Sequence, residues 1–456
     1  MALVCWALQL TIATAWAGPY SSAVGSTGDA NAYDEPIPGY FGPGGEPGLV
    51  TLGSTLNPVF VDWASGYADY ASAPPADPPY DTVDYAQRRG VAGQFQTPTR
   101  LLGPVTGDHF DIVSLGDLYQ DQVDAGVEPG QITVTFDRPI RNGAGADFAA
   151  FENGSISQGG AGVPGEILAE FAFVEVSTNG SDFARFPSVS LTDALVGPYG
   201  TVDPTNVYNL AGKHVNAYPG LANSGSWGTP FNLDDLADDP LVLAGTVDLT
   251  DINFVRFIDI TGNGQTADQA TRLIEPETGE PYTADHMIYD AWVTWGSGGA
   301  DLEAVGVIHR VEFGDVNRDG VIDGLDIDAL FDLAGSDDED GDLDGSGLVD
   351  YDDARQLVED ILGTAFGDAN LDGRVNAQDY TALADYFGQS DAGWANADFN
   401  GDGRVNAQDY ATLAANFGEV YATAETIDPV ALPEPTTGLA LGALSLTLLA
   451  RRRRLE

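Results

Sequence analysis

Cysteine and lysine are almost absent from this chain. Among its 456 residues there is one cysteine, Cys5, and one lysine, Lys213. Cys5 lies in an N-terminal segment that we expect to be removed, so the mature chain would have no thiol and no disulfide. These absences exclude cysteine-based zinc sites, thiol nucleophiles and a disulfide scaffold. Stability is then expected to come from burial of apolar residues and from bound metal.

Positive charge is also scarce. The chain has 18 basic against 70 acidic residues and a formal net charge of −52. A phosphate backbone would repel such a chain, so we do not expect nucleic acid as a partner. Divalent cations are the natural counterions. An acidic surface adapted to salty water is the alternative explanation of the overall charge, but it does not explain acids that recur at fixed spacing.

Common catalytic motifs are missing as well. The chain contains no G-x-S-x-G elbow, no H-E-x-x-H motif and no phosphate-binding glycine loop. The four histidines are scattered and are expected to be structural or surface residues: His109, His214, His286 and His309. A pair of carboxylates can hydrolyse glycosidic bonds, but the sequence singles out no pair. We therefore predict no catalytic residue and no organic cofactor, with a glycoside hydrolase as the alternative.

The sequence predicts a targeting signal at each end of the chain. Residues 1–17 are apolar and end in Ala15-Trp16-Ala17, which predicts a signal peptide, although no basic residue precedes the apolar run. A buried first helix or strand is the alternative. At the other end, Leu432-Pro433-Glu434-Pro435 precedes a short apolar run, residues 436–450, and Arg451 to Arg454. A helix of this length barely crosses a bilayer, and the arginines would stay cytoplasmic.

This C-terminal layout resembles the PEP-CTERM sorting tail, which combines a Pro-Glu-Pro motif, a short membrane span and an arginine cluster. The resemblance implies export to a Gram-negative-type envelope and processing by an exosortase-type membrane protease. An uncut membrane anchor is the alternative. Residues 419–432 show no strong period and are expected to form an extended linker.

A twelve-residue pattern occurs four times between residues 315 and 409. The copies start at Asp315, Asp342, Asp368 and Asp398, which are 27, 26 and 30 residues apart. Calcium takes six to eight oxygen ligands, and a tight loop can supply them from positions 1, 3, 5, 7, 9 and 12. A glycine at position 6 permits the sharp turn. Here that glycine is present in every copy, as Gly320, Gly347, Gly373 and Gly403.

We therefore predict four calcium loops, which we call loop 1 (residues 315–326), loop 2 (342–353), loop 3 (368–379) and loop 4 (398–409). The predicted side-chain ligands at positions 1, 3, 5, 9 and 12 are Asp315, Asn317, Asp319, Asp323 and Asp326 in loop 1; Asp342, Asp344, Ser346, Asp350 and Asp353 in loop 2; Asp368, Asn370, Asp372, Asn376 and Asp379 in loop 3; and Asp398, Asn400, Asp402, Asn406 and Asp409 in loop 4. Loop 2 is expected to be the weakest site, because Ser346 replaces a carboxylate.

Each loop is expected to run into one helix. Position 9 can cap the helix N-terminus, and position 12 then lies at the third helical residue. Glycines at the helix ends predict C-terminal caps: Gly335, Gly363, Gly388 and Gly418. The apolar residue at position 8 is expected to pair two loops as a short strand. In the last two repeats an apolar stripe is expected to bury one helical face: Tyr380, Leu383, Ala384 and Phe387, and Tyr410, Leu413, Ala414 and Phe417.

A loop followed by a single helix, with aspartate at position 12, resembles the dockerin type I repeat, a relative of the EF-hand. Four repeats correspond to two tandem modules, or to one module and a divergent pair. The resemblance implies attachment to a cohesin-like domain. In that family positions 10 and 11 help to recognise the partner, often as Ser or Thr beside a polar or basic residue. Here they are Gly324-Leu325, Tyr351-Asp352, Ala377-Gln378 and Ala407-Gln408.

The region before the repeats looks mainly β. Residues 18–104 are rich in glycine and proline and predict an irregular lead-in with one or two strands. Short β-rich runs between residues 105 and 312 predict an antiparallel jelly-roll-like sandwich. Runs such as the one that starts at Asp147 resemble an uncharacterised β-sandwich of PEP-CTERM surface proteins and, loosely, discoidin-like carbohydrate-binding jelly rolls.

The jelly-roll resemblance implies a structural calcium ligand on the last strand. Asp301 and Glu303 suit this role, with Asp147 or Glu152 as partners, and solvent-facing acids are the alternative. Three tryptophans are candidates for stacking on sugar rings, with burial in the core as the alternative: Trp227, Trp292 and Trp295.

The predicted fold is a mainly β jelly-roll-like sandwich followed by a small all-α, dockerin-like calcium-binding region. The predicted order of segments is signal peptide 1–17, lead-in 18–104, sandwich 105–312, repeats 1 and 2 at 313–364, repeats 3 and 4 at 365–418, linker 419–432 and sorting tail 433–456. We expect an exported calcium-binding surface protein with a role in adhesion or the extracellular matrix. A dockerin-bearing polysaccharide-degrading enzyme or its carbohydrate-binding partner, and a purely structural envelope protein, are the alternatives. A polysaccharide is the expected ligand class.

Overall fold

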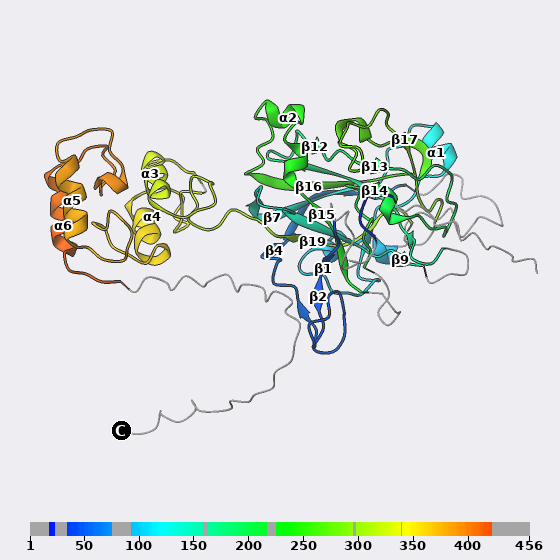
Figure 1. The fold of residues 1–456 in the computed structure, drawn as a ribbon, viewed down its shortest axis with the longest axis horizontal. Helices are drawn as coiled ribbons and strands as arrows, with labels where there is room; N and C mark the ends of the chain where they lie inside the picture. The colour runs from blue at the N-terminus through cyan, green and yellow to red at the C-terminus, as the bar shows by residue number, and fades with distance from the viewer. Residues whose placement is uncertain are drawn as a thin grey trace, which may run out of the picture. The chain divides into compact units, whose positions relative to one another are not determined.

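The structure is a computed structural model that describes residues 18–22, 34–74, 93–157, 163–216, 225–294, 298–338 and 340–421. It divides into two compact units (Figure 1). The first unit contains Met1–Glu312 with Arg318–Gly320, and the second contains Phe313–Asn317 with Val321–Glu456. The predicted signal peptide and sorting tail lie outside the described residues. Among the residues that are described, none of the helices combines the length and apolar character needed to cross a bilayer.

Two antiparallel sheets form most of the first unit. The first sheet has the order β1-β15-β8-β19-β4, with β6 also paired to β19, and the second has the order β12-β11-β16-β7-β5. The strands of the first sheet are β1 (Ile37–Pro38), β15 (Trp227–Phe231), β8 (Phe148–Glu152), β19 (Asp301–Val307), β4 (Asp62–Trp63) and β6 (Val113–Ser114). Those of the second are β12 (Ala184–Arg185), β11 (Ala172–Ser177), β16 (Ile252–Asp259), β7 (Gln131–Ile140) and β5 (Gly66–Ala71).

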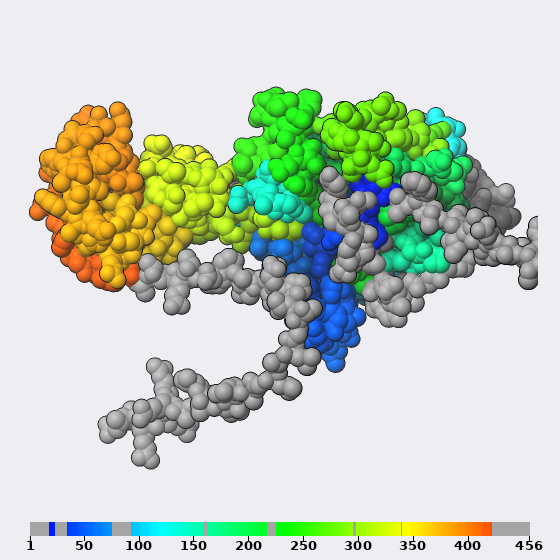
Figure 2. Space-filling model, in the orientation of Figure 1, coloured from blue at the N-terminus to red at the C-terminus, as the bar shows by residue number. Residues whose placement is uncertain are grey.

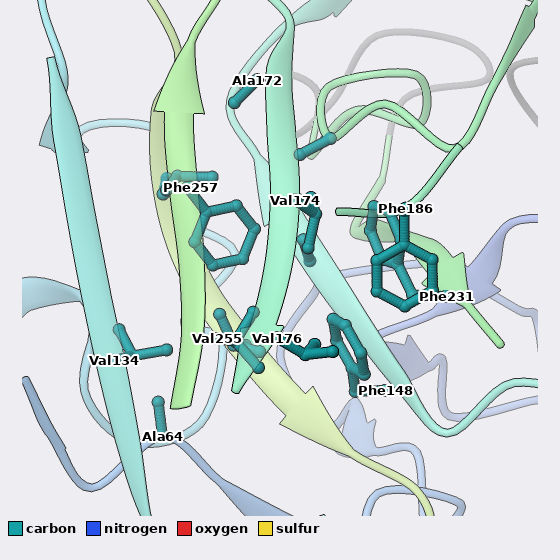
Figure 3. Close-up of a cluster of buried hydrophobic side chains, with 14 of the residues drawn as sticks. Ala64, Val134, Phe148, Ala172, Val174, Val176, Phe186, Phe231, Val255 and Phe257 are labelled. Carbon is teal, nitrogen blue, oxygen red and sulfur yellow. The ribbon is translucent and has the colours of Figure 1, made fainter. Parts of the chain in front are cut away.

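One apolar core is shared by these two sheets (Figure 3). Val134, Val174 and Phe257 of the second sheet belong to the same buried cluster as Phe148 and Phe231 of the first. The rings of Phe148 and Phe231 stack with centroids 5.2 Å apart, a separation that is typical of favourable aromatic pairs. All six residues of β11 are buried, which explains why its sequence, AFVEVS, is more apolar than that of a one-sided strand.

Smaller elements complete the first unit. They are the strand pairs β2 (Tyr40–Phe41) with β3 (Thr55–Leu56), β9 (Ser155–Ile156) with β10 (Ile167–Leu168), β13 (Val189–Ser190) with β14 (Val207–Tyr208) and β17 (Asn263–Ala267) with β18 (Met287–Tyr289), and the helices α1 (Gln120–Asp124) and α2 (Pro240–Leu243). Figure 2 shows the segment around β2 and β3, in blue, standing out from the surface of this unit.

The mainly β character of the first unit is confirmed, whereas the jelly-roll class in particular stays a prediction. The lead-in differs from its expected irregular form. Residues 34–74 contain β1 to β5, and β1, β4 and β5 pair with strands of the two main sheets. Most of these strands are two residues long, so they leave no alternation of apolar and polar residues in the sequence.

In the second unit the regular elements are helical. They are α3 (Gly324–Asp332), α4 (Tyr351–Arg355), which continues as the π-helical turn η7 (Gln356–Ile361), α5 (Ala377–Tyr386), the short 3-10 helix η8 (Trp394–Asn396) and α6 (Ala407–Asn416). Residues from all four repeats form one buried apolar cluster, which includes Ile327, Leu357, Val375 and Leu413. The finer division into two modules at residue 364 stays a prediction.

Candidate metal centre

The aspartate at position 12 holds each predicted calcium loop closed. In loop 3, Asp379 Oδ1 accepts a hydrogen bond from Ala369 N at 3.0 Å and Oδ2 accepts one from Asn376 N at 2.8 Å. Asp409 makes the same two-sided contact in loop 4. In loops 1 and 2, Asp326 and Asp353 also accept from the N–H of position 9, and their other oxygen accepts from the N–H of position 3. All four of these residues are at most 1 % exposed. The structure therefore brings position 12 back to the start of its own loop.

Helix capping explains why position 12 reaches this place. The position 9 side chain accepts a hydrogen bond from the main-chain N–H two residues later, at 2.8 Å in every loop. Position 12 is the third helical residue, and its carboxylate accepts from the N–H of position 9. This reciprocal arrangement is a capping box. The prediction that position 9 caps the helix, with position 12 one turn later, is confirmed.

Glycine conformations also follow the prediction. The position 6 glycines have φ between 74° and 89°, and the glycines after the helices have φ between 63° and 94°. A second left-handed residue occurs at position 4 of each loop: Arg318, Gly345, Leu371 and Gly401, with φ between 54° and 71°. The sequence reasoning missed this turn, because only two of the four residues are glycine. The two left-handed residues together curl each loop tightly.

Position 1 is anchored by the same turn. In loops 2, 3 and 4 one carboxylate oxygen accepts a hydrogen bond from the N–H of the position 6 glycine, at 2.7–2.8 Å. In loop 4 the other oxygen, Asp398 Oδ1, is buried and has no hydrogen-bond partner among the described residues. An unpaired buried carboxylate oxygen is costly unless a cation or a proton satisfies it.

Loop 2 brings together one oxygen each from Asp342, Asp344 and Asp353, within 4.8 Å of one another. Calcium binds oxygens at ~2.3–2.6 Å, so three donors at this spacing suit a single ion. Loops 1, 3 and 4 have asparagine at position 3, and their corresponding donor is an amide oxygen. The expected weakness of loop 2, based on Ser346, stays a prediction.

Burial and mutual repulsion leave these carboxylates poorly suited to stay charged without a cation. Burial, together with the nearby charges of Asp409 and Asp402, raises the pKa of Asp398. Burial, followed by the charge of Asp368, raises the pKa of Asp379. A bound dication acts in the opposite direction and favours the ionised form.

The residue at position 8 does not pair two loops with each other, so that expectation is wrong. Val375 in loop 3 accepts a hydrogen bond from Gly418 N at 2.8 Å and donates one to Glu419 O at 3.2 Å. Val405 in loop 4 makes the same pair of bonds with Gly388 and Gln389. Each loop therefore pairs with the end of the other repeat's helix, because the C-terminal glycine turns the chain back toward it.

The predicted apolar stripe on α5 and α6 is mostly exposed, which corrects a second expectation. Leu383 and Leu413 are each 2 % exposed, but Tyr380 and Tyr410 are each 49 % exposed and Phe387 and Phe417 are each 56 % exposed. The capping box fixes the helix rotation, since position 12 must face inward, and the leucine one turn later follows it. The aromatic residues then face solvent, and Ala377, Tyr380, Tyr410, Leu413, Ala414 and Phe417 line a shallow hollow.

Two of the acids that the sequence singled out in the first unit, Asp147 and Glu303, hold separate turns. Asp147 accepts hydrogen bonds from Gly143 N, Leu233 N and His309 Nδ1 at 2.7–2.8 Å. Glu303 Oε1 accepts three hydrogen bonds at 2.7 Å, from the main chain and hydroxyl of Thr106 and from Gly107 N. Both carboxylates thus fix nearby main chain, and Asp147 directly precedes β8, the strand that Glu152 ends.

The tryptophans favour the burial alternative where they are described. Trp227 is 9 % exposed. Trp292 is half-buried, and its Nε1 donates to Leu118 O at 2.9 Å. Trp295 lies outside the described residues.

Comparison with known families identifies part of the second unit. Residues 366–417 match the family model of the dockerin type I domain. The match spans loops 3 and 4 with their helices and confirms the dockerin part of the prediction for these residues. Dockerin type I domains bind calcium and bind cohesin domains. No curated protein matches the chain.

Proposed function

We propose that this is an exported cell-surface protein whose second unit folds around calcium and attaches to a cohesin-like domain, while its first unit binds an external ligand without catalysis. The observation that carries the proposal is the position 12 carboxylate. In all four loops, two of them inside the dockerin match, it accepts hydrogen bonds from the start of its loop and from position 9.

Charge supports calcium as the resident ion. Residues 315–418 contain 25 acidic residues and 4 arginines. Oxygen donors at all the ligand positions suit a hard cation such as calcium. We infer that loops 1 and 2, which lie outside the dockerin match, bind calcium through the same positions, since they share the same capping box and left-handed turns.

The exposed aromatic surface on α5 and α6 supports a protein partner. Tyr380 and Tyr410, at matching places in two repeats, line a hollow together with Phe417. Such contiguous apolar surface commonly marks an interaction site. Small and amide residues at positions 10 and 11 leave this surface neutral. We therefore infer that a cohesin-like partner presents an apolar face rather than a charged one.

Export is inferred from the two ends of the chain. Our proposal is that the signal peptide directs export, that residues 436–450 hold the chain in the membrane at least for a time, and that an exosortase-type protease processes the tail. A polysaccharide is the proposed ligand class of the first unit, with adhesion or matrix formation as its role.

The calcium and partner parts of the proposal can be tested on one sample of the mature chain. Far-UV circular dichroism in EDTA and then in millimolar calcium should show a gain of helix. Binding to a panel of cohesin domains should occur only in calcium. Equal spectra in the two conditions, or cohesin binding in EDTA, would contradict the proposal. The ligand part is tested with a glycan array and with assays for reducing-sugar release, where release of sugar would contradict a non-catalytic role.

A further inference from the structure

Five carboxylates that are far apart in the sequence converge at one end of the first unit. Glu152 is the last residue of β8 and Asp259 the last of β16, while Glu170 precedes β11 by two residues. Asp290 directly follows β18, and Asp117 follows β6 by three residues. Asp301, the first residue of β19, lies beside Glu152, because Leu302 pairs with Glu152 across the sheet. We call the five residues Asp117, Glu152, Glu170, Asp259 and Asp290 the end cluster.

The end cluster is buried. Glu152, Glu170, Asp259 and Asp290 are between 1 % and 7 % exposed, and Asp117 is half-buried. No ion pair among the described residues includes any of the five. Isolated buried carboxylates are strongly unfavourable in the charged form. Something other than a basic side chain must therefore balance this group.

Direct contacts connect members of the end cluster. The hydroxyl of Thr294 lies 2.9 Å from Asp117 Oδ2 and also contacts Glu170 Oε1. A hydroxyl has one proton and can donate to only one of the two carboxylates at a time. Glu170 Oε1 also accepts from Gly299 N at 3.2 Å, and Asp259 Oδ1 accepts from the next residue, Ala300 N, at 2.8 Å. These contacts hold three carboxylates around Thr294, Gly299 and Ala300.

Two carboxylate oxygens of the end cluster are left over. Glu152 Oε2 accepts from Gly154 N at 2.8 Å, but Oε1 is buried without a hydrogen-bond partner among the described residues. Asp259 Oδ2 is also buried and has no hydrogen-bond partner among the described residues. Main-chain N–H groups orient one oxygen of each carboxylate, so the unused oxygens are fixed in place and available to a ligand.

Burial raises the pKa of every carboxylate in the end cluster. Burial raises the pKa of Asp117 to about 7 and that of Glu152 to about 8. Burial, followed by the charges of neighbouring acids, raises the pKa of Glu170 well above its ordinary value, and the same direction holds for Asp259 and Asp290. Glu170, Asp259 and Asp290 are thus repelled by neighbouring members of the cluster, as expected for carboxylates that lie close together.

We propose that the end cluster binds a divalent cation, calcium, which ties the ends of strands from both sheets together. The donors are carboxylates and one hydroxyl, which suit a hard cation, and calcium is better matched than magnesium to a cage made of protein oxygens. Their oxygens are more widely spread than those of loop 2, where three lie within 4.8 Å. Binding therefore draws the carboxylates inward around the ion. This site is independent of the dockerin loops and of the proposed function.

The test uses the full mature chain and calcium as the probe. The E152Q/D259N double variant removes the negative charge of the two carboxylates that have an oxygen without a partner, and it keeps the size of both side chains. The E303Q variant is the matched control. Glu303 is equally buried and its Oε2 likewise has no hydrogen-bond partner among the described residues, but its Oε1 accepts three hydrogen bonds from Thr106 and Gly107, outside the cluster. We expect equilibrium dialysis to show the double variant binding about one calcium ion fewer per chain, and the control binding as many as the unmodified protein. An unchanged ion count in the double variant would overturn the proposal.

A second measurement covers the case in which the double variant does not fold. Infrared spectroscopy of the unmodified protein detects buried protonated carboxylic acids through their C=O stretch. At neutral pH we expect this band in EDTA and its loss on addition of calcium, because a cation replaces the protons. A band that persists unchanged in excess calcium would show that protons, not an ion, balance the end cluster, and would overturn the proposal.

Discussion

The indole Nε1 of Trp394 donates a hydrogen bond to the main-chain carbonyl oxygen of Asp368, at 2.8 Å. Asp368 is the first residue of loop 3, so this bond joins the short helix η8 to the start of a predicted calcium loop. Trp394 is fully buried, and its ring packs edge-on against Phe366 and Phe399 with centroids 5.6 and 5.3 Å away. Trp394, which lies between loops 3 and 4, thus contacts both loops, through Asp368 in loop 3 and Phe399 in loop 4.

Removing this side chain should destabilise the second unit strongly. We expect Trp394→Ala to lower the free energy of unfolding by about 3–5 kcal/mol, because it leaves a large cavity. Trp394→Phe keeps most of the volume and loses the hydrogen bond, so a smaller loss of about 1–2 kcal/mol is expected. Urea unfolding of the calcium-loaded chain, followed by helical circular dichroism, measures both. Equal losses in the two variants would show that ring volume does not matter here.

Substitution at position 12 should impair calcium binding far more than substitution of a solvent-facing acid. Asp409→Asn removes the negative charge of the side chain that closes loop 4 and replaces one of its two oxygens by an NH2 group. Asp385→Asn makes the same change at an exposed acid on α5. We expect the first variant to weaken calcium binding at least tenfold, which is about 1.4 kcal/mol, and the second to change it little. Calcium titration calorimetry compares them. Similar affinities would contradict the assignment of Asp409 as a ligand.

The exposed tyrosines should affect partner binding without affecting calcium. In the Tyr380→Ser/Tyr410→Ser double variant the hollow between α5 and α6 loses two of its lining side chains. We expect a loss of more than tenfold in cohesin binding, since aromatic residues dominate such interfaces, and an unchanged calcium affinity. Tyr386→Ser is the control, because Tyr386 is exposed but does not line the hollow. A partner that binds the double variant normally would place the interface elsewhere.

Stability of the first unit in EDTA should fall as the pH rises. Burial raises the pKa of Glu303 to about 7, above its value in the unfolded chain. Between these two pKa values the folded form keeps a proton on Glu303 that the unfolded chain releases. The contribution of Glu303 to folding stability is therefore fully present below the pKa of the unfolded chain and is lost as the pH rises through about 7. We expect the melting temperature in EDTA to decrease between pH 5 and pH 8, and Glu303→Gln to reduce that decrease. Calorimetric melting measures this, and a rising melting temperature would contradict the sign.

The sequence predicted the local features of the second unit well. Caps, left-handed glycines and the return of position 12 to its own loop all depend on residues within twelve positions of one another. The pairing of Val375 with Gly418 and the exposure of Tyr380 depend on how two repeats dock, which spacing within one repeat does not encode. Trp394 gave no signal, because it lies between repeats and matches no repeated position.

The first unit was predicted only in outline. Runs such as QITVTF show their strands directly, whereas β1 and β4 are too short to show a period and gain their place by pairing with distant strands. The sequence named Glu152 of the end cluster as a possible calcium ligand, but the other four members could not be found for the same reason. Asp117 and Asp290 are far apart along the chain and come close only because β6 of the first sheet and β18 of the small β17–β18 pair end near the same place.

The central claim is that the second unit folds around calcium. It is tested most directly by titrating the mature chain with calcium in EDTA-treated buffer and following both the heat and the far-UV circular dichroism. The account predicts heat of binding, a gain of helical signal and saturation at about four ions from the dockerin-like loops, with any further ion assigned by the E152Q/D259N variant. A chain that is already fully helical in EDTA and takes up calcium without heat or spectral change would contradict it.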